Sequence, residues 1–272
     1  MSFIWNLMSK AKISEDMLTK NAIPKLDFYK LKFDKQNPLS IYSYGKFYKG
    51  KYDNKDITLK VVDITINQNI MNEFILWKNF QKNEHFLKLK GIILYYNEAY
   101  IIFEDFFQNT LQTLLEQNKL NYNEKIDIAK QILNILNSLN EEKKVNGDLR
   151  PGTLVINSDK KIKIIDLGLF ANNKNLDENN EIENIRIRYS PPEYIDENIV
   201  DKSYDIYSFG CILIDLFAKD LNETVFINKN KSYEEYISEI KNNKFPIIPN
   251  NVNYLLYDIV FRCLIHDPKK KN

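Results

Sequence analysis

The stretch "DIYSFGCILIDLF", residues 205–217, is apolar on nearly every side of a helix. Such a helix has to be buried inside a sizeable lobe, because no face of it suits water. A second apolar stretch, "YLLYDIVFRCLI" at 254–265, and the amphipathic run "NEKIDIAKQILNILNSLN" at 123–140 supply neighbours for it. The spacing in that run predicts a buried face formed by Ile126, Ala129, Leu133, Leu136 and then Leu139 or Asn140. The chain beyond about residue 107 is therefore predicted to be mostly helical.

The first part of the chain has a different pattern. The runs "YGKFYKGKY" (44–52), "DITLKVVDI" (56–64) and "AYIIFEDF" (99–106) are short, β-branched or aromatic, and typical of strands. "DNKD" between the first two has the composition of a hairpin turn. "NIMNEFILWKNF" (69–80) has helical spacing. Together the two parts predict an α+β fold with two lobes, in which the first is β-rich with one main helix.

The composition is that of an ordinary soluble globular protein. Of the 272 residues 44% are hydrophobic, and the formal net charge is +1. This balance gives no support for nucleic acid or a membrane surface as a partner, and no apolar run reaches the roughly 18 residues of a membrane helix. The two cysteines, Cys211 and Cys263, lie in apolar helical stretches, which favours reduced thiols. We therefore expect a cytoplasmic protein.

Two charged side chains stand where the periodicity predicts burial. Lys60 lies inside the apolar strand "ITLKVV", and Glu73 shares a helical stripe with Ile70, Trp77 and Phe80. A buried unpaired charge is strongly unfavourable, so each needs a partner of opposite sign. The simplest solution is an ion pair between Lys60 and Glu73. The alternative is that either side chain reaches solvent, which lysine does readily along its aliphatic stem.

A predicted hairpin brings two carboxylates together. "TLVI" and "KIKII" flank "NSDKK", so residues 154–156 and 162–164 should pair. Asp148 precedes the first strand and Asp166 follows the second, which places both at one end of the hairpin, near Thr153. Oxygen ligands of this kind suit a hard cation such as Mg²⁺. The alternative is that each aspartate caps a local turn.

In this order, the features resemble the eukaryotic protein-kinase fold over nearly all of residues 31–272, closest to tyrosine-kinase-like Ser/Thr kinases. "ITLK" resembles the V-A-I-K strand, "GDLRP" the catalytic loop, "DLG" at 166–168 the D-F-G motif, and "YSPPEY" the A-P-E region. "DIYSFG" is similar to the D-x-W-S-x-G helix, whose first residue, here Asp205, braces the catalytic loop. Each motif alone is weak evidence, but their order and spacing together are specific.

The resemblance implies a role for each matching residue. The implied catalytic residues are Asp148, Lys60, Glu73 and Arg150. The implied nucleotide-binding set is Gly45, Phe47, Lys60, Phe103 at the gatekeeper position, Glu104 and Phe106. The implied metal ligands are Asp166 and Thr153, for Mg²⁺ or Mn²⁺ bound with ATP. Aminoglycoside-kinase-type phosphotransferases share G-D-L-x-P and I-D-x-G, but they are not expected to show "YSPPEY" followed by "DIYSFG".

Departures from the family pattern weaken the implied phosphate and metal sites. Of the glycine-rich loop only Gly45 remains, because Ser40 and Tyr42 replace the first two glycines. These glycines let the backbone approach the phosphates, so the cradle is expected to be looser or partly blocked, unless Tyr42 points outward. Thr153 replaces the asparagine that binds the second Mg²⁺, and Arg150 replaces the usual lysine.

Other departures concern regulation. Asn146 and Gly147 replace the His-Arg pair of the catalytic loop, so an amide that needs hydrogen bonds stands in for the imidazole. The lost arginine is the one that docks a phosphorylated activation loop, and no Ser, Thr or Tyr lies between Asp166 and Tyr189. Activation by phosphorylation of this loop is not expected. Arg186 and Arg188 further along either favour an acidic substrate or belong to a solvated loop.

These patterns predict a protein-kinase-like domain that binds ATP, transfers phosphate weakly or not at all, as a pseudokinase does, and signals through protein partners. An active Ser/Thr kinase independent of loop phosphorylation is the first alternative, and a nucleotide-free interaction module is the second. We expect an N-lobe with hinge at 31–106 and a C-lobe at 107–272, which stops before the family's last helix. Residues 1–30, with "ISEDMLTK" helical, are interpreted as a frayed extension, or else as a segment that docks on a partner or on the lobe.

Overall fold

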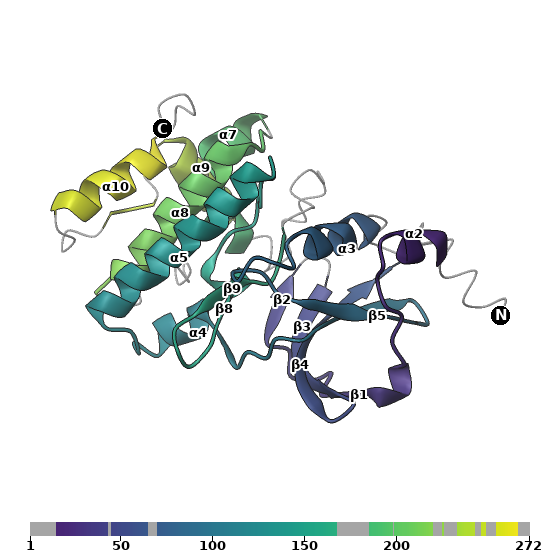
Figure 1. The fold of residues 1–272 in the computed structure, drawn as a ribbon. Helices are drawn as coiled ribbons and strands as arrows, with labels where there is room; N and C mark the ends of the chain where they lie inside the picture. The colour runs from purple at the N-terminus through teal and green to yellow at the C-terminus, as the bar shows by residue number, and fades with distance from the viewer. Residues whose placement is uncertain are drawn as a thin grey trace. The chain divides into compact units, whose positions relative to one another are not determined.

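The computed structural model describes residues 15–42, 45–64, 70–167, 185–197, 199–219, 225, 233–242, 246–248 and 254–265. The chain forms two compact units (Figure 1). The first unit comprises 1–110, 155–159 and 163–165, and the second comprises 111–154, 160–162 and 166–272. The first is built on a sheet and the second on helices, which confirms the predicted α+β fold with a β-rich and a helical lobe.

The first unit contains an antiparallel sheet with the strand order β1-β3-β4-β6-β5, and β2 also pairs with β3. Its strands are β1 (Leu31–Phe33), β2 (Ser40–Tyr42), β3 (Gly45–Tyr52), β4 (Lys55–Asp63), β5 (Leu89–Tyr95) and β6 (Glu98–Phe103). Asp53 and Asn54, with φ of 52° and 62°, connect β3 to β4. Two successive left-handed residues are the signature of the tight turn that suits the twist of a hairpin. The hairpin predicted at "DNKD" is therefore confirmed.

Alternation along the strands gives the sheet two different faces. Lys60 and Phe103 point toward the side of helix α3 (Ile70–Asn79), because they contact Glu73 and Trp77 of that helix. Their strand neighbours point the other way, into an apolar cluster made of Tyr48, Tyr52, Ile57, Leu59, Val61, Ile93, Tyr100 and Ile102. The two faces of the sheet therefore pack against different groups within the first unit.

The N-terminal segment is docked on the first unit. Helix α2 (Glu15–Lys20) is followed by an extended stretch that pairs with β5 at Lys25 and Ile92, and then by the 3-10 turn η1 (Phe28–Lys30). Leu18 and Ile23 are buried. The interpretation of residues 1–30 as a frayed end is wrong for residues 15–30, and the alternative of docking on the lobe holds for them.

The second unit is organised around α8 (Lys202–Phe217), which is buried along nearly its whole length as its composition predicted. Its N-terminus is capped by Asp201, whose side chain accepts a hydrogen bond from the Ser203 N–H. The other helices are α4 (Leu111–Glu116), α5 (Tyr122–Glu141), α7 (Pro192–Glu197), α9 (Tyr233–Lys241) and α10 (Tyr254–Leu264), together with the 3-10 turn η2 (Pro151–Thr153).

The buried face of α5 differs from the predicted one. Its buried side chains are Ile128, Ala129, Ile132, Ile135, Leu136 and Leu139. Leu133, predicted to be inside, is 41% exposed, and Ile126 is only partly buried. The helix carries apolar residues around about half of its circumference. Two stripes therefore fit the helical period, and packing selects the one that includes Ile128 and Ile132.

The predicted hairpin forms strands β8 (Leu154–Ile156) and β9 (Ile162–Ile164), at the predicted residues. With β7 (Asn109–Thr110) they make a three-stranded sheet in the order β7-β8-β9. The Gln131 side chain of α5 donates to the Lys160 carbonyl at 2.9 Å and accepts from the Ile162 N–H at 3.0 Å. These two bonds hold the hairpin turn on α5.

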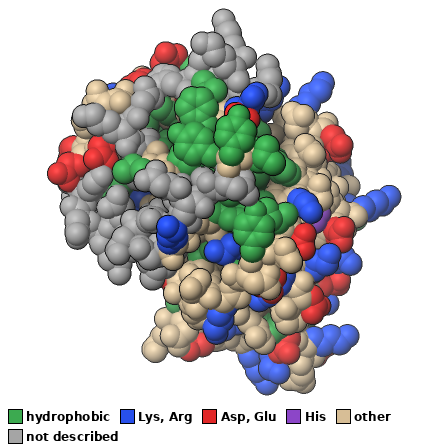
Figure 2. Space-filling view, turned by 90° about the vertical axis from the view of Figure 1, so that its left-hand side faces the viewer, with side chains coloured by type: hydrophobic (Ala, Val, Ile, Leu, Met, Phe, Trp, Pro, Cys, Tyr) green, Lys and Arg blue, Asp and Glu red, His purple; other side chains and the backbone are tan. Residues whose placement is uncertain are grey.

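Helix α10 is apolar on both sides. Leu256, Val260 and Cys263 are buried, while the outer side exposes Tyr254, Leu255, Tyr257, Ile259 and Phe261. Figure 2, which views the molecule from the side of α10, shows hydrophobic side chains grouped on the surface.

Cys211 and Cys263 are both buried free thiols. Among the residues that the structure describes, no helix is long and apolar enough to cross a membrane.

Candidate functional site

Lys60 of β4 and Glu73 of α3 form a buried ion pair in the first unit. The Lys60 Nζ lies 2.8 Å from the Glu73 Oε1, and each side chain is 1% exposed. The Trp77 indole N–H donates to the same carboxylate oxygen at 3.2 Å. The predicted pairing is confirmed, and the alternative that either group reaches solvent is wrong. Removing one partner would leave a buried uncompensated charge, so the pair ties α3 to the sheet.

The second carboxylate oxygen of Glu73 is buried and accepts no hydrogen bond from the described residues. A buried acceptor without a donor is unfavourable by about 1–3 kcal/mol. Glu73 therefore retains an accepting position for a water molecule or a bound group, beside the ammonium of Lys60.

Aromatic side chains line the strand positions next to Lys60. Phe103 is fully buried, with its ring centroid 5.0 Å from that of Trp77 and 6.1 Å from that of Phe47. Phe47, also fully buried, lies 5.7 Å from the Lys60 ammonium, measured to its ring centroid. After β6 the chain turns outward, with Glu104 exposed and Phe106 37% exposed.

Gly45 is needed for close packing between strands. A Cβ at this position would lie 2.7 Å from the Val61 carbonyl oxygen of β4. The structure thus gives Gly45 a role in strand pairing. Its implied role in the phosphate cradle stays a prediction, because residues 43 and 44 and the Tyr42 side chain lie outside the described part.

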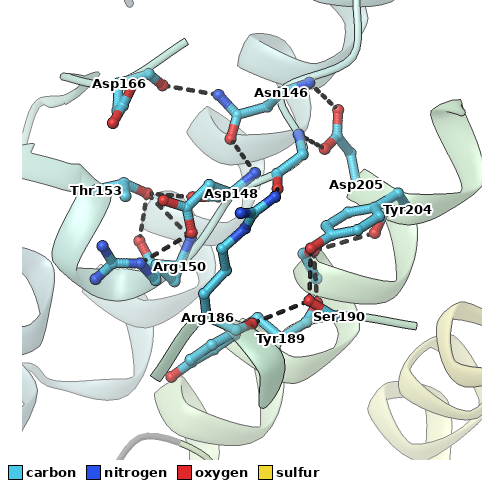
Figure 3. Close-up of polar contacts among 12 residues, drawn as sticks. Asn146, Asp148, Arg150, Thr153, Asp166, Arg186, Tyr189, Ser190, Tyr204 and Asp205 are labelled. Atoms are coloured by element: carbon cyan, nitrogen blue, oxygen red, sulfur yellow. Dashed lines mark hydrogen bonds and ion pairs between the residues drawn. The ribbon is translucent and has the colours of Figure 1, made fainter. Parts of the chain in front are cut away.

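In the second unit, Asp205 at the start of α8 holds the loop that carries Asp148 (Figure 3). Its two carboxylate oxygens accept the backbone N–H groups of Asn146 at 2.7 Å and Gly147 at 2.8 Å. Burial raises the pKa of Asp205 to about 6, against the lowering effect of these two bonds. The two bonds join residues that are 59 and 58 positions apart in the sequence. They therefore attach the loop to the buried helix α8.

Asn146 connects this loop to Asp166. Its side-chain N–H group donates to the Asp166 carbonyl at 2.7 Å, and its side-chain oxygen accepts the Asp148 N–H at 3.0 Å. The amide is completely buried, and both ends of it are hydrogen-bonded (Figure 3). The need for partners that the sequence predicted for this amide is therefore met. Through it, Asp148 and Asp166 come together as the hairpin predicted.

Arg150 and Thr153 shape the same loop from within. The Arg150 Nε donates to the Asp148 Oδ1 at 3.0 Å. The Thr153 hydroxyl accepts the Arg150 N–H at 3.0 Å and lies 2.8 Å from the Arg150 carbonyl and 3.1 Å from the Asp148 carbonyl, to which it can donate. Thr153 is fully buried. Its oxygen is thus used mainly to close the turn η2, and its implied role as a metal ligand stays a prediction.

Burial and three neighbouring charges act on the pKa of Asp148, which is raised overall. Burial raises the pKa of its carboxyl, Arg150 and Arg186 lower it, and the neighbouring charge of Asp166 raises it again. Arg186 is itself buried, and its guanidinium lies 3.5 Å from the Gly147 carbonyl. This burial contradicts the alternative that Arg186 belongs to a solvated loop, whereas a role toward an acidic substrate stays a prediction.

The donor set fits a hard divalent cation that shares its coordination sphere with another ligand. Asp148 and Asp166 are two carboxylates, and Asp166 is close enough for its charge to raise the pKa of Asp148. No group of three or more His, Cys, Asp or Glu side chains suited to a metal occurs among the described residues. Mg²⁺ commonly uses one or two carboxylates and completes its shell with phosphate oxygens and water, which two carboxylates allow.

Some supporting residues were missed from the sequence. Asp105 accepts the Lys88 N–H at 2.6 Å and pairs with Lys163 of β9 at 2.7 Å. Tyr189 donates to Asp215 of α8 at 2.6 Å. All of these contacts are long-range, and no local pattern signals them. Gly168, which ends the "DLG" motif, lies outside the described residues.

The family model described as protein tyrosine and serine/threonine kinase matches residues 34–272. The chain belongs to this family. As a kinase domain, it is 23% identical over 258 residues to the dual specificity protein kinase shkB of Dictyostelium discoideum, an alignment that covers 91% of this chain and 39% of the relative.

Two other relatives give a similar picture. The probable serine/threonine-protein kinase mkcF of Dictyostelium discoideum is 25% identical, with 84% of this chain and 33% of the relative covered. The cysteine-rich receptor-like protein kinase 24 of Arabidopsis thaliana is 24% identical, with 79% and 36% covered. The chain spans less than two fifths of the length of these three relatives. Membership in the family implies ATP, a divalent metal and a protein substrate in general terms.

Proposed function

We propose that this kinase domain binds ATP with a divalent cation and transfers phosphate slowly or not at all, acting in signalling through protein partners. In this proposal Lys60 contacts the nucleotide phosphates, and Phe103, Glu104 and Phe106 contact the base side. Asp166 holds the cation. When bound, the cation supplies positive charge that offsets the charge of the phosphates.

The observation that carries the proposal is a contrast between Lys60 and Glu73 of the first unit and Thr153 of the second. The Lys60–Glu73 pair is fully formed and buried, at 2.8 Å, which supports nucleotide binding. The hydroxyl of Thr153, by contrast, is engaged with the backbone of Arg150 and Asp148. Because phosphoryl transfer depends on metal charge and positioning, a weak second metal ligand should lower transfer more than binding.

The experiment is a thermal melt with and without ATP, in Mg²⁺, in Mn²⁺ and in chelator. A ligand at about 100 times its dissociation constant stabilises by roughly 2.7 kcal/mol, which corresponds to a shift of several degrees for a protein of this size. The matched variants are Asp166→Asn and the double variant Lys60→Met/Glu73→Leu, which removes both charges of the pair. We expect a metal-dependent shift that both variants abolish. The absence of any shift in the unmodified chain would favour a nucleotide-free module.

An active Ser/Thr kinase is the second candidate, and the loop geometry favours it. Asp205 and Asn146 hold Asp148 without help from a phosphorylated residue. The test is transfer of labelled phosphate to a generic protein substrate, compared with Asp148→Asn. Transfer that disappears in this variant would support the active kinase. Transfer that rises in Thr153→Asn would show that the second metal position limits the rate.

A further inference from the structure

The first unit contains a second attachment for α3, made by the segment that begins with α2. Helix α2 ends at Lys20, and Ala22 follows with a left-handed φ of 46°. The Ile23 N–H bonds to the Leu18 carbonyl, and the Ala22 N–H bonds to the Thr19 carbonyl, both at 2.9 Å. This is a Schellman ending, in which Leu18 and Ile23 form the accompanying apolar contact. It turns the Asn21 carbonyl outward from the helix end.

Lys78, in the last turn of α3, donates to this Asn21 carbonyl. A helix C-terminus is a favourable place for a cation, because its carbonyls carry partial negative charge. In Figure 1, α2 lies beside α3. Glu73 is five residues before Lys78 on the same helix, about 7.5 Å along its axis. The two ends of α3 are therefore held by different partners.

The segment after α2 is anchored to the sheet by backbone hydrogen bonds. The Ile92 N–H donates to the Pro24 carbonyl at 2.9 Å, and the Leu26 N–H donates to the Ile92 carbonyl at 2.8 Å. β5 is an edge strand, so this pairing covers its open side. Gly91 makes room for it, because a Cβ there would lie 2.5 Å from the Pro24 carbonyl oxygen.

The anchor continues on the opposite face of the sheet. The Asp27 N–H donates to the Tyr52 hydroxyl at 3.0 Å. Phe28 stacks on Tyr95 with ring centroids 3.8 Å apart and meets the edge of Tyr100. Residues 24–28 are thus fixed at several points to the sheet, and residues 18–23 are continuous with them. A contact from this segment to α3 can therefore position the helix.

We propose that residues 18–28 form a clamp that keeps α3 where Glu73 pairs with Lys60, with Lys78 as the positioning residue. α3 has only 10 residues, and helices this short depend on packing for their position. The activation loop has no Ser, Thr or Tyr to be phosphorylated, so the clamp supplies a constitutive support. The proposal rests on the proposed nucleotide-binding role of Lys60, but the clamp itself can be tested without nucleotide.

The test is hydrogen exchange of the full chain, read from peptides covering α3 and α5. Lys78→Met removes a charge-assisted hydrogen bond. Bonds of this kind favour the docked state of a helix over its locally opened state by about tenfold or more. The amides of α3 should therefore exchange about tenfold faster. Gly91→Ala should do the same by displacing residues 24–26. Lys78→Arg should restore protection. The control is Lys35→Met, which breaks the exposed Lys35–Glu98 pair of the same unit and should leave α3 unchanged.

The outcomes separate the clamp from the proposed function. Faster exchange confined to α3, with α5 unchanged, supports the clamp whether or not ATP binds. Wild-type protection of α3 in both Lys78→Met and Gly91→Ala would overturn it, even if ATP shifts the melting temperature of the chain. If Gly91→Ala loosens α5 as well, it has unfolded the protein, and Lys78→Met alone decides. ATP titrations of the same variants then show whether the loss of α3 protection weakens binding.

Discussion

Replacing Asp205 by asparagine should remove a measurable part of the pH dependence of stability. The pKa of this buried carboxyl is about 6 in the folded chain and 3.8 without the fold. Because the folded pKa is raised, folding favours the protonated acid. Its contribution to stability is therefore full below about pH 4 and is lost as the pH rises through 6. Between pH 4.5 and 7.5 this linkage amounts to about 2 kcal/mol.

The assay is urea unfolding of the wild type and of Asp205→Asn at several values between pH 4.5 and 7.5. The other ionisable groups are shared, so their contributions cancel in the difference. We expect the unfolding free energy of the wild type to fall by about 2 kcal/mol relative to the variant over this range. Parallel curves would refute the reasoning, because they would mean that Asp205 titrates at its ordinary pKa. The variant should also be offset at all pH values, since an amide offers only one oxygen to two N–H donors.

Three further predictions concern other contacts. Lys60→Met should lower the unfolding free energy by about 3–5 kcal/mol in urea titrations, because it leaves Glu73 charged and buried. The double variant Lys60→Met/Glu73→Leu should recover much of that loss. A double variant whose loss equals the sum of the two single losses would contradict the pairing. Thr153→Val keeps the shape of the side chain but removes the hydroxyl that closes η2, and should cost about 1 kcal/mol in the same assay; an unchanged midpoint would mean that the turn does not need this bond. Gly210→Ala should destabilise by about 1–3 kcal/mol, because a Cβ would lie 2.7 Å from the Cys263 Cβ of α10, and a melting temperature equal to wild type would show that α10 moves away freely.

Local pattern was enough for the parts of the fold that depend on neighbouring residues. The β3–β4 hairpin, α3, α8 and the strands at 154–156 and 162–164 follow from periodicity and turn composition. The Lys60–Glu73 pair followed from the unfavourable burial of single charges. For α5, helical periodicity selected the wrong stripe at Leu133, because apolar residues that extend around about half of the helix allow more than one buried face.

The rest depends on contacts that the chain order does not reveal. The docking of residues 24–26 uses backbone groups at a sheet edge, and such bonds leave little trace in side-chain type. Gly91 makes room for this pairing, but a glycine in a strand does not identify the segment that approaches it. The burial of Arg186 is set by a carbonyl of a loop 39 residues away. The sequence indicated that the Asn146 amide needs hydrogen-bond partners. It did not indicate which groups these are, and the structure shows the Asp148 N–H and the Asp166 carbonyl.

The substitution at residue 146 also changes how the domain responds to acid. An imidazole in that position would gain a proton near pH 6.5 and lose its ability to accept a hydrogen bond. A carboxamide has no such transition, so the link from Asp148 through Asn146 to the Asp166 carbonyl has a single hydrogen-bonding state. The chain contains two histidines, His85 and His266, and His85, the one within the described residues, is not among the residues of this link. Mild acidification should therefore leave this connection intact while it protonates Asp205 on the other side of the same loop.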